Sequence, residues 1–211
     1  YKESESQFIK VIDINNNYKE SELFYGMIQS QLGRYNKAIE IFKRLIKNKN
    51  KLEESYYNLG IVYQKIDEFS LSIEYFEKAI KIDNQKYKYF NSKGISFQKL
   101  LNYEKADFCY KKAIKLNNNY AKAYSNLGLL NQRSGFFEEA LNYFNIALDK
   151  DPQDYEILYN KSICLLENGN FKDGLSYYKW RQSGKFLKND KFNLKNINNR
   201  KILITCDQGL G

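Results

Sequence analysis

The stretch AKAYSNLGLLNQRSGFFEEALNYFNIALDKDPQD, from Ala121 to Asp154, decides how the rest of the sequence is interpreted. Apolar side chains recur every three or four residues on both sides of Gly135, which predicts two amphipathic helices with a break between them. The helices are expected from about Lys122 to Arg133 and from about Phe137 to Lys150. Pro152 ends the second helix because it lacks a backbone N–H and disfavours helical angles at the residue before it. The stretch is therefore predicted to be a helical hairpin.

The same unit recurs along the chain with a period of 34 residues. A small residue stands on each first helix, at Gly26, Gly60, Gly94, Gly128 and Ser162. A second small residue stands on each second helix, at Ser4, Ala38, Ser72, Ala106, Ala140 and Gly174. An aromatic residue lies deeper in each second helix, at Phe8, Phe42, Phe76, Tyr110, Phe144 and Tyr178. Small residues allow the two helix axes to approach closely while aromatic rings fill the space around them.

A 34-residue hairpin repeat with these columns resembles the tetratricopeptide repeat. The resemblance implies an all-α fold, a right-handed solenoid of helical hairpins, over residues 1–182. We divide this array into a half repeat and five repeats, at residues 1–18, 19–52, 53–86, 87–120, 121–154 and 155–182. Because the first unit holds only the second half of a repeat, we expect the chain to be a fragment of a longer protein.

Only one complete repeat has proline in its last turn, and the others carry Asn50, Asn84 and Asn118 there. Asparagine tolerates left-handed backbone angles and can bond to its own backbone. We therefore expect these helices to end without proline.

Composition excludes several kinds of site. The chain has no histidine, so Ser/His and Cys/His catalytic arrangements are impossible within it. Cys109, Cys164 and Cys206 form no C-x-x-C pair, which argues against a metal site and predicts buried thiols in a reducing compartment, the cytoplasm. No run of 18 or more apolar residues predicts a membrane span. The sequence thus indicates no catalytic residue, metal or cofactor.

The net charge of +9 is not spread evenly over 211 residues. The segment from Arg181 to Lys201 carries seven basic side chains against one acid, Asp190, and accounts for most of the excess. The repeats themselves show no basic stripe of the kind that a phosphate backbone would need. Nucleic-acid binding is therefore not favoured.

The C-terminal segment has a different character from the repeats. We interpret residues 183–200 as a basic connector and KILITC, residues 201–206, as a short strand followed by a glycine-rich loop, Asp207, Gln208, Gly209, Leu210 and Gly211. Glycines after a strand let backbone N–H groups approach a phosphate, so this loop is a candidate nucleotide-sugar or phosphate loop. An unrelated α/β domain with the same opening stays an alternative.

Together with Tyr178, Lys179, Trp180 and Arg181, this segment resembles the start of the GT-B type glycosyltransferase domain in bacterial proteins that fuse such repeats to a transferase. Asp207 stands where that family more often has glutamate, which leaves the role of the loop open. The resemblance implies a truncated α/β domain from residue 201 onward, with a sugar nucleotide bound in the missing downstream part.

In tetratricopeptide arrays the first helices line a concave groove. The positions that we expect to face it here combine amides with aromatic and aliphatic groups: Tyr57, Asn58, Ile61, Gln64, Asn91, Gln98, Ser125, Asn126, Leu129, Gln132, Tyr159 and Asn160. Amides can bond a peptide backbone while apolar groups receive its side chains, so this surface suits an extended peptide. The column of Asn58, Asn126 and Asn160 also resembles the asparagine ladder of the O-linked N-acetylglucosamine transferases, although Phe24 and Ser92 interrupt it.

These observations lead to one functional hypothesis and one alternative. The hypothesis is a protein- or peptide-binding module that recruits substrates or partners for a larger bacterial glycosyltransferase. The alternative is an assembly scaffold without enzymatic activity.

Overall fold

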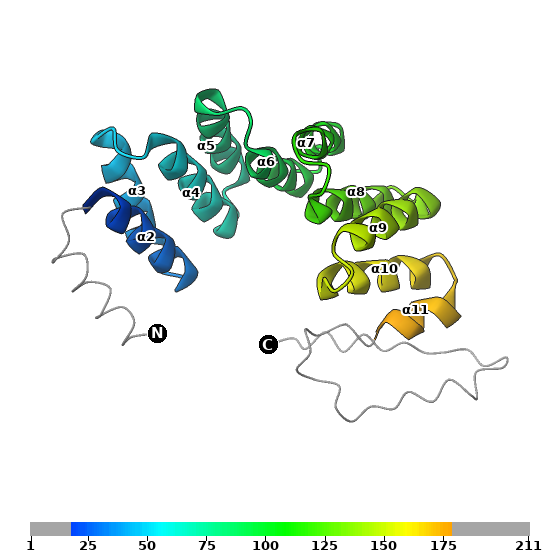
Figure 1. Cartoon of the computed structure of the whole chain (residues 1–211). Coiled ribbons are helices and arrows are strands. Elements are labelled where there is room, and N and C mark those ends of the chain that lie inside the picture. The colour runs from blue at the N-terminus through cyan, green and yellow to red at the C-terminus, as the bar shows by residue number, and fades with distance from the viewer. Residues whose placement is uncertain (1–17, 179–211) are drawn as a thin grey trace.

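The computed structural model describes residues 18–178, in which the chain forms ten α-helices and no strand (Figure 1). The helices are α2 (Tyr18–Gln31), α3 (Tyr35–Lys47), α4 (Leu52–Lys65), α5 (Phe69–Ile82), α6 (Tyr87–Lys99), α7 (Tyr103–Leu116), α8 (Ala121–Arg133), α9 (Phe137–Lys150), α10 (Tyr155–Glu167) and α11 (Phe171–Tyr178). The bounds predicted for α8 and α9 agree with those observed to within a residue. Residues 1–17 of the predicted half repeat, the connector at 183–200, and the strand and loop at 201–211 lie outside the described residues.

The helices pair into hairpins whose turns share one backbone geometry. The left-handed residue in each turn recurs every 34 residues, at Gly33, Asp67, Leu101, Gly135 and Gly169. The residue after it donates its N–H to a carbonyl in the last turn of the first helix, as Phe136 does to Asn131 at 2.9 Å and Asn102 to Phe97 at 2.9 Å. This arrangement satisfies carbonyl groups that the helix end leaves without a partner. The turn thus has the same backbone conformation in every described hairpin.

The turns between hairpins form without proline, as expected, but by another route. Neither Asn84 nor Asn118 has a positive φ, and in the first of these turns the left-handed residues are Lys49 and Lys51 instead of Asn50. The side chains of the preceding residues close the later turns. Asp83 Oδ1 accepts the N–H of Gln85 at 2.8 Å, and Asn117 Oδ1 accepts that of Asn119 at 3.0 Å.

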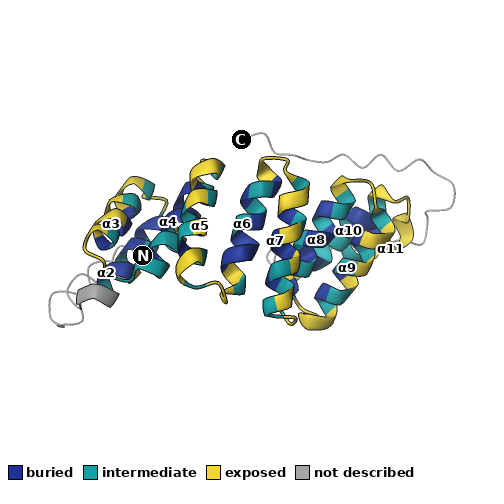
Figure 2. Cartoon of the chain, turned by 90° about the horizontal axis from the view of Figure 1, so that it is seen from above, coloured by how far each residue is buried: buried dark blue, intermediate teal, exposed yellow. Residues whose placement is uncertain are grey.

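The stacking of the hairpins curves the array. Each first helix, α2, α4, α6, α8 or α10, contacts the first helix of the next hairpin, and each second helix packs on the first helix that follows it. Within residues 18–178 the second helices α3, α5, α7, α9 and α11 make no contact with one another. The first helices therefore lie closer together, on the inner side of the arch in Figure 1. Figure 2 shows the same division, with most exposed positions on the second helices.

Glycine and an aromatic ring form the recurring core contact. A Cβ atom added to Gly128 would lie 2.7 Å from the ring of Phe144, and one added to Gly60 would lie 2.7 Å from that of Phe76. Both rings are fully buried. The sequence prediction paired the glycine with the alanine of the second helix, whereas the atoms nearest to Gly128 all belong to Phe144. The glycine thus lets the ring lie directly on the backbone of the first helix.

The last described hairpin reverses this arrangement. Ser162 replaces the glycine of the first helix, and its hydroxyl donates a hydrogen bond to the carbonyl oxygen of Gly174 at 3.0 Å. The glycine now stands on the second helix, where an added Cβ would lie 2.7 Å from the side chain of Leu166. One residue without a side chain is still present at the crossing, so the hairpin keeps its close packing.

Candidate functional site

The candidate site is the surface that the first helices present to the inside of the arch. Side chains four residues apart lie on one face of a helix. One aliphatic side chain stands at the same position of the 34-residue repeat on each of α4, α6, α8 and α10. These four side chains are all partly exposed: Ile61, Ile95, Leu129 and Ile163. They form an apolar row across the array, which we call the groove floor.

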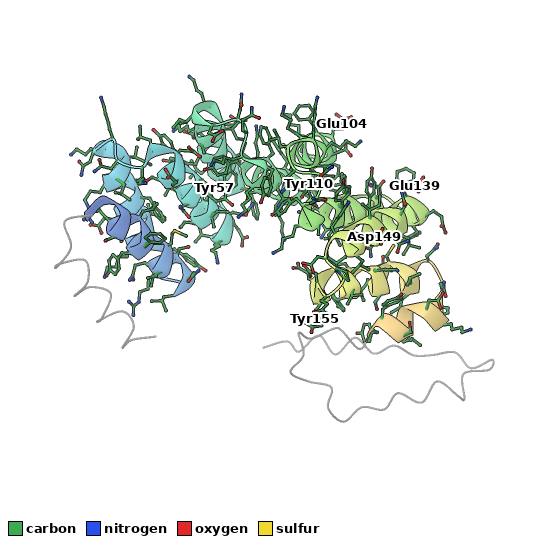
Figure 3. The ribbon with its side chains drawn as sticks, viewed as in Figure 1. Tyr57, Glu104, Tyr110, Glu139, Asp149 and Tyr155 are labelled. Atoms are coloured by element: carbon green, nitrogen blue, oxygen red, sulfur yellow. The ribbon has the colours of Figure 1, made fainter. Side chains whose placement is uncertain are left out.

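Tyr57, at the start of this surface, serves mainly to join neighbouring hairpins (Figure 3). Its ring centroid lies 4.5 Å from that of Tyr89 and 5.7 Å from that of Phe76. Its hydroxyl oxygen is 3.2 Å from Ser92 Oγ. Burial raises the pKa of Tyr57 above its ordinary value, so the phenol stays neutral. The side chain is therefore held in place before any ligand binds.

Gln64 is also engaged within the array. Its Nε2 donates to the carbonyl oxygen of Ser92 at 3.0 Å and to Ser96 Oγ at 2.7 Å. Ser96 Oγ in turn lies 2.9 Å from Ser72 Oγ, so the network reaches α5. These serines were not among the predicted site residues. Their only sequence signal is that serine replaces alanine in the small column at Ser72.

Three predicted groove residues, Asn91, Gln98 and Ser125, do not point outward as expected, because the structure buries them. Gln98 Oε1 accepts a hydrogen bond from the hydroxyl of Tyr110 at 2.6 Å, within one hairpin. Burial raises the pKa of Tyr110, which keeps the donor protonated. Burying an amide is favourable only when it is hydrogen-bonded, and here the partner belongs to the protein itself.

The asparagine column has no common role in the described residues. Asn58 Nδ2 donates to the carbonyl oxygen of Glu54 on its own helix at 2.8 Å. Asn126 Nδ2 donates to Asn91 Oδ1 at 2.9 Å and so connects α8 to α6. The side chain of Asn160 makes no hydrogen bond within residues 18–178. A ladder that holds a peptide backbone stays a prediction, and two of its three amides already donate one hydrogen bond within the protein.

The end of the surface near α10 carries two further predicted residues. Gln132 Nε2 donates to Glu167 Oε2 at 2.8 Å, while its Oε1 is buried and has no hydrogen-bond partner among the described residues. The ring of Tyr159 lies 6.1 Å from that of Tyr178, centroid to centroid. Like the other groove residues, they stay predicted ligand contacts.

Two equivalent hollows lie away from the groove, and sequence reasoning missed both. One, of about 340 Å³, includes Lys93, Phe97 and Cys109, and the other, of about 410 Å³, includes Lys161 and Leu165. Each forms where a lysine occupies the position, repeated every 34 residues, that holds Leu59 and Leu127 in two other repeats. Lys93 pairs with Glu77 at 2.7 Å, whereas Lys161 lies over the ring of Tyr177 at 4.7 Å.

Clustered metal ligands, membrane-spanning helices and reactive thiols are other features that would indicate a function in the described residues. They contain no cluster of three potential metal ligands, and none of their helices combines the length and apolar character that a bilayer crossing requires. Cys109 and Cys164 are buried and free, as predicted. Burial raises the pKa of each thiol to about 11, so neither is a ready nucleophile. Cys206 and the candidate phosphate loop at 207–211 lie outside the described residues.

Comparison with known proteins identifies the repeat. Family profiles described as tetratricopeptide repeat match residues 53–85 and 126–180, and one described as TPR repeat matches 28–67 and 102–135. No curated protein matches the sequence.

Solved structures share the fold at low sequence identity. PilF of Pseudomonas aeruginosa is 19% identical, with a TM-score of 0.68 over 77% of this chain and 74% of that chain. MamA is 22% identical, with a TM-score of 0.62 over 74% of this chain and 91% of that chain. YrrB, described as a TPR protein with an unusual peptide-binding site, is 21% identical, with a TM-score of 0.58 over 82% of this chain and 89% of that chain.

These likenesses show the fold, and the profile matches, which together span more than half of the sequence, show the family. The chain belongs to the tetratricopeptide repeat family.

Proposed function

We propose that this chain is a protein- or peptide-binding module whose ligand lies in the groove of the first helices. The observation that carries the proposal is the groove floor, a row of partly exposed aliphatic side chains with polar and charged groups on both sides. An extended peptide can place alternate side chains on such a floor while the polar groups bond its backbone. The peptide-binding site named for YrrB supports this use of the fold in another protein.

The geometry favours an elongated ligand over a small molecule. The groove floor continues over α4, α6, α8 and α10, and neighbouring helix axes are about 8 to 10 Å apart. A small ligand would contact one or two of these helices only. A protein segment can contact all of them, and the sum of several weak contacts then gives affinity without any deep pocket.

We further propose that the array recruits substrates for a bacterial glycosyltransferase in the cytoplasm. The support is the sequence from Tyr178 to Gly211, with its strand-like run and the loop at 207–211, and the free buried thiols that suit a reducing compartment. A sugar nucleotide would bind the domain that this segment opens. Sequencing the coding region beyond Gly211 tests this step. Alternating strands and helices over some 200 or more residues would support a transferase, and a stop or further helical repeats would leave a scaffold.

Peptide binding itself can be tested with a displayed peptide library and the full chain. The groove variant is Ile95→Asn with Leu129→Asn, and the control is Leu71→Asn with Ile82→Asn on α5, where both side chains are exposed. We expect the library to yield peptides that bind the wild type and the control but not the groove variant. Peptides that the control loses instead, or no enriched peptide at all, would contradict the proposal.

A further inference from the structure

The two middle first helices carry unpaired cations at both ends of their inner face. On α6 the residues Lys88, Ser92, Ile95 and Lys99 are spaced by four, three and four, which places them on one face of the helix. On α8 the same spacing gives Lys122, Asn126, Leu129 and Arg133. Each set contains one member of the groove floor between two cations. The charges therefore flank the surface on which a peptide would lie.

These four cations have no carboxylate partner in the described part of the chain. Lys88, Lys99, Lys122 and Arg133 are all exposed, and no ion pair includes any of them. Some lysines elsewhere are paired, for example Lys78 with Glu74 at 2.6 Å, and others on the second helices, such as Lys81 and Lys115, are not paired within residues 18–178. The position of the four cations beside the groove floor is therefore what distinguishes them. The inner face of α6 and α8 thus keeps its positive charge available for a ligand.

The first helices on either side have a different charge. On α4 the equivalent positions hold Glu54 and Lys65, and on α10 they hold Glu156 and Glu167. The positive charge is therefore confined to the middle of the groove, between a neutral and an acidic section. A ligand complementary to this surface would be acidic over a short length only.

We propose that the section of the groove formed by α6 and α8 takes an extended, acidic protein segment, with carboxylates near both rims and an apolar side chain on the floor. The inference rests on the proposed peptide-binding function and names its partner class. The distance between the cations on one helix supports it. Eleven residues of helix rise about 16 Å, which about five residues of extended chain can span where the segment crosses the groove obliquely from one rim to the other.

Charge complementarity distinguishes this ligand from a neutral one. An exposed ion pair contributes between about 0.2 and 1 kcal/mol, and four pairs at about 0.4 kcal/mol each correspond to an affinity difference of about fifteenfold. Isoleucine and leucine between the cations disfavour a ligand that is charged throughout, because its central charge would lose water without gaining a partner. A segment of mixed acidic and apolar residues satisfies both conditions.

Two labelled peptides test the inference with the full chain. One is about nine residues long and has glutamate, leucine and glutamate at every second position, so that all three face the groove when the chain is extended. The other has every side-chain carboxylate replaced by an amide. We expect fluorescence anisotropy at moderate salt to show at least tenfold tighter binding of the acidic peptide. Equal binding of the two peptides would overturn the acidic preference while leaving peptide binding intact. Binding of neither would overturn both.

A matched pair of variants tests whether the preference for the acidic peptide comes from the cations of the groove. The groove variant carries Lys88→Gln, Lys99→Gln, Lys122→Gln and Arg133→Gln. The control carries the same change of charge on exposed lysines in the last turns of four second helices, Lys47→Gln, Lys81→Gln, Lys115→Gln and Lys150→Gln. We expect the groove variant to lose the tenfold preference and the control to keep it. An equal loss in both, or a single-stranded oligonucleotide that displaces the peptide with a steep salt dependence, would overturn the proposal.

Discussion

Replacing Gly128 with alanine tests the glycine–ring contact that recurs in the first four described hairpins. The added Cβ would lie 2.7 Å from Cε1 of Phe144, and the three nearest atoms all belong to that ring. Carbon atoms in contact prefer about 3.5 to 4.0 Å, so the helix and the ring must separate by roughly 1 Å. The ring is fully buried, so it can move only by displacing its neighbours in the core. The substitution should therefore strain the hairpin of α8 and α9.

Two opposing effects set the size of the change. Overpacking a core costs about 1 to 3 kcal/mol, whereas alanine is better than glycine inside a helix by about 1 kcal/mol. We expect a net loss of about 1 kcal/mol in the free energy of unfolding, which lowers Tm by about 2 to 4 °C in a chain of this size. Thermal and urea unfolding, followed by circular dichroism, would measure it.

A second background separates the clash from the helix preference. In a Phe144→Leu variant the ring is absent, so the alanine should meet no clash and should stabilise the protein by up to about 1 kcal/mol. The sign of the effect of Gly128→Ala is thus expected to reverse between the two backgrounds. Stabilisation in the wild-type background, or the same effect in both, would refute the packing argument.

Three further substitutions or conditions give definite expectations. Leu101 is 68% exposed and has a φ of +60°, which is strained for a residue with a side chain. In urea unfolding, Leu101→Gly should therefore raise the free energy of unfolding by up to about 1 kcal/mol, and Gly135→Leu should lower it by at least as much. A loss of stability in Leu101→Gly would contradict the strain at this position. Lys161→Leu and Lys93→Leu both restore the residue type of Leu59 and Leu127. The first should raise Tm by more than the second, because only Lys93 loses a carboxylate partner, Glu77. Equal shifts in Tm would show that this ion pair contributes nothing to stability. The pKa of Cys109 and Cys164 rises from about 9 to about 11 on folding, so the native state binds more protons between these values and stability should fall as pH rises from 9 to 11. Alanine at both positions should reduce that fall, and an unchanged pH profile would contradict the cause.

The fold could be predicted because its packing contact recurs in the sequence. Gly60, Gly94 and Gly128 each meet an aromatic ring sixteen residues later, so one period fixes both the hairpin and its repeat. The turn between the two helices of each hairpin was harder to predict from the sequence. Its left-handed position is glycine in three hairpins but Asp67 and Leu101 in the others, which hides the column from a reader who looks for glycine.

The site could be assigned to a helix face but not to particular contacts. An amide on an inner helix can bond a peptide or the adjacent helix, and sequence spacing does not distinguish the two. Asn126 donates a hydrogen bond to Asn91, and Gln64 donates one to Ser96, and these residues meet only because the hairpins stack on one another. The cations of α6 and α8 were overlooked because a net charge does not show on which face of a helix the basic residues lie.

Photo-crosslinking from the groove floor tests the central claim most directly. A benzophenone side chain would replace Leu129 in one variant and Ile82, which is 51% exposed on α5, in another. The account predicts that a bound peptide crosslinks to the variant at Leu129 and not to the one at Ile82. A crosslink at Ile82 alone would place the ligand on the second helices and contradict a binding groove formed by the first.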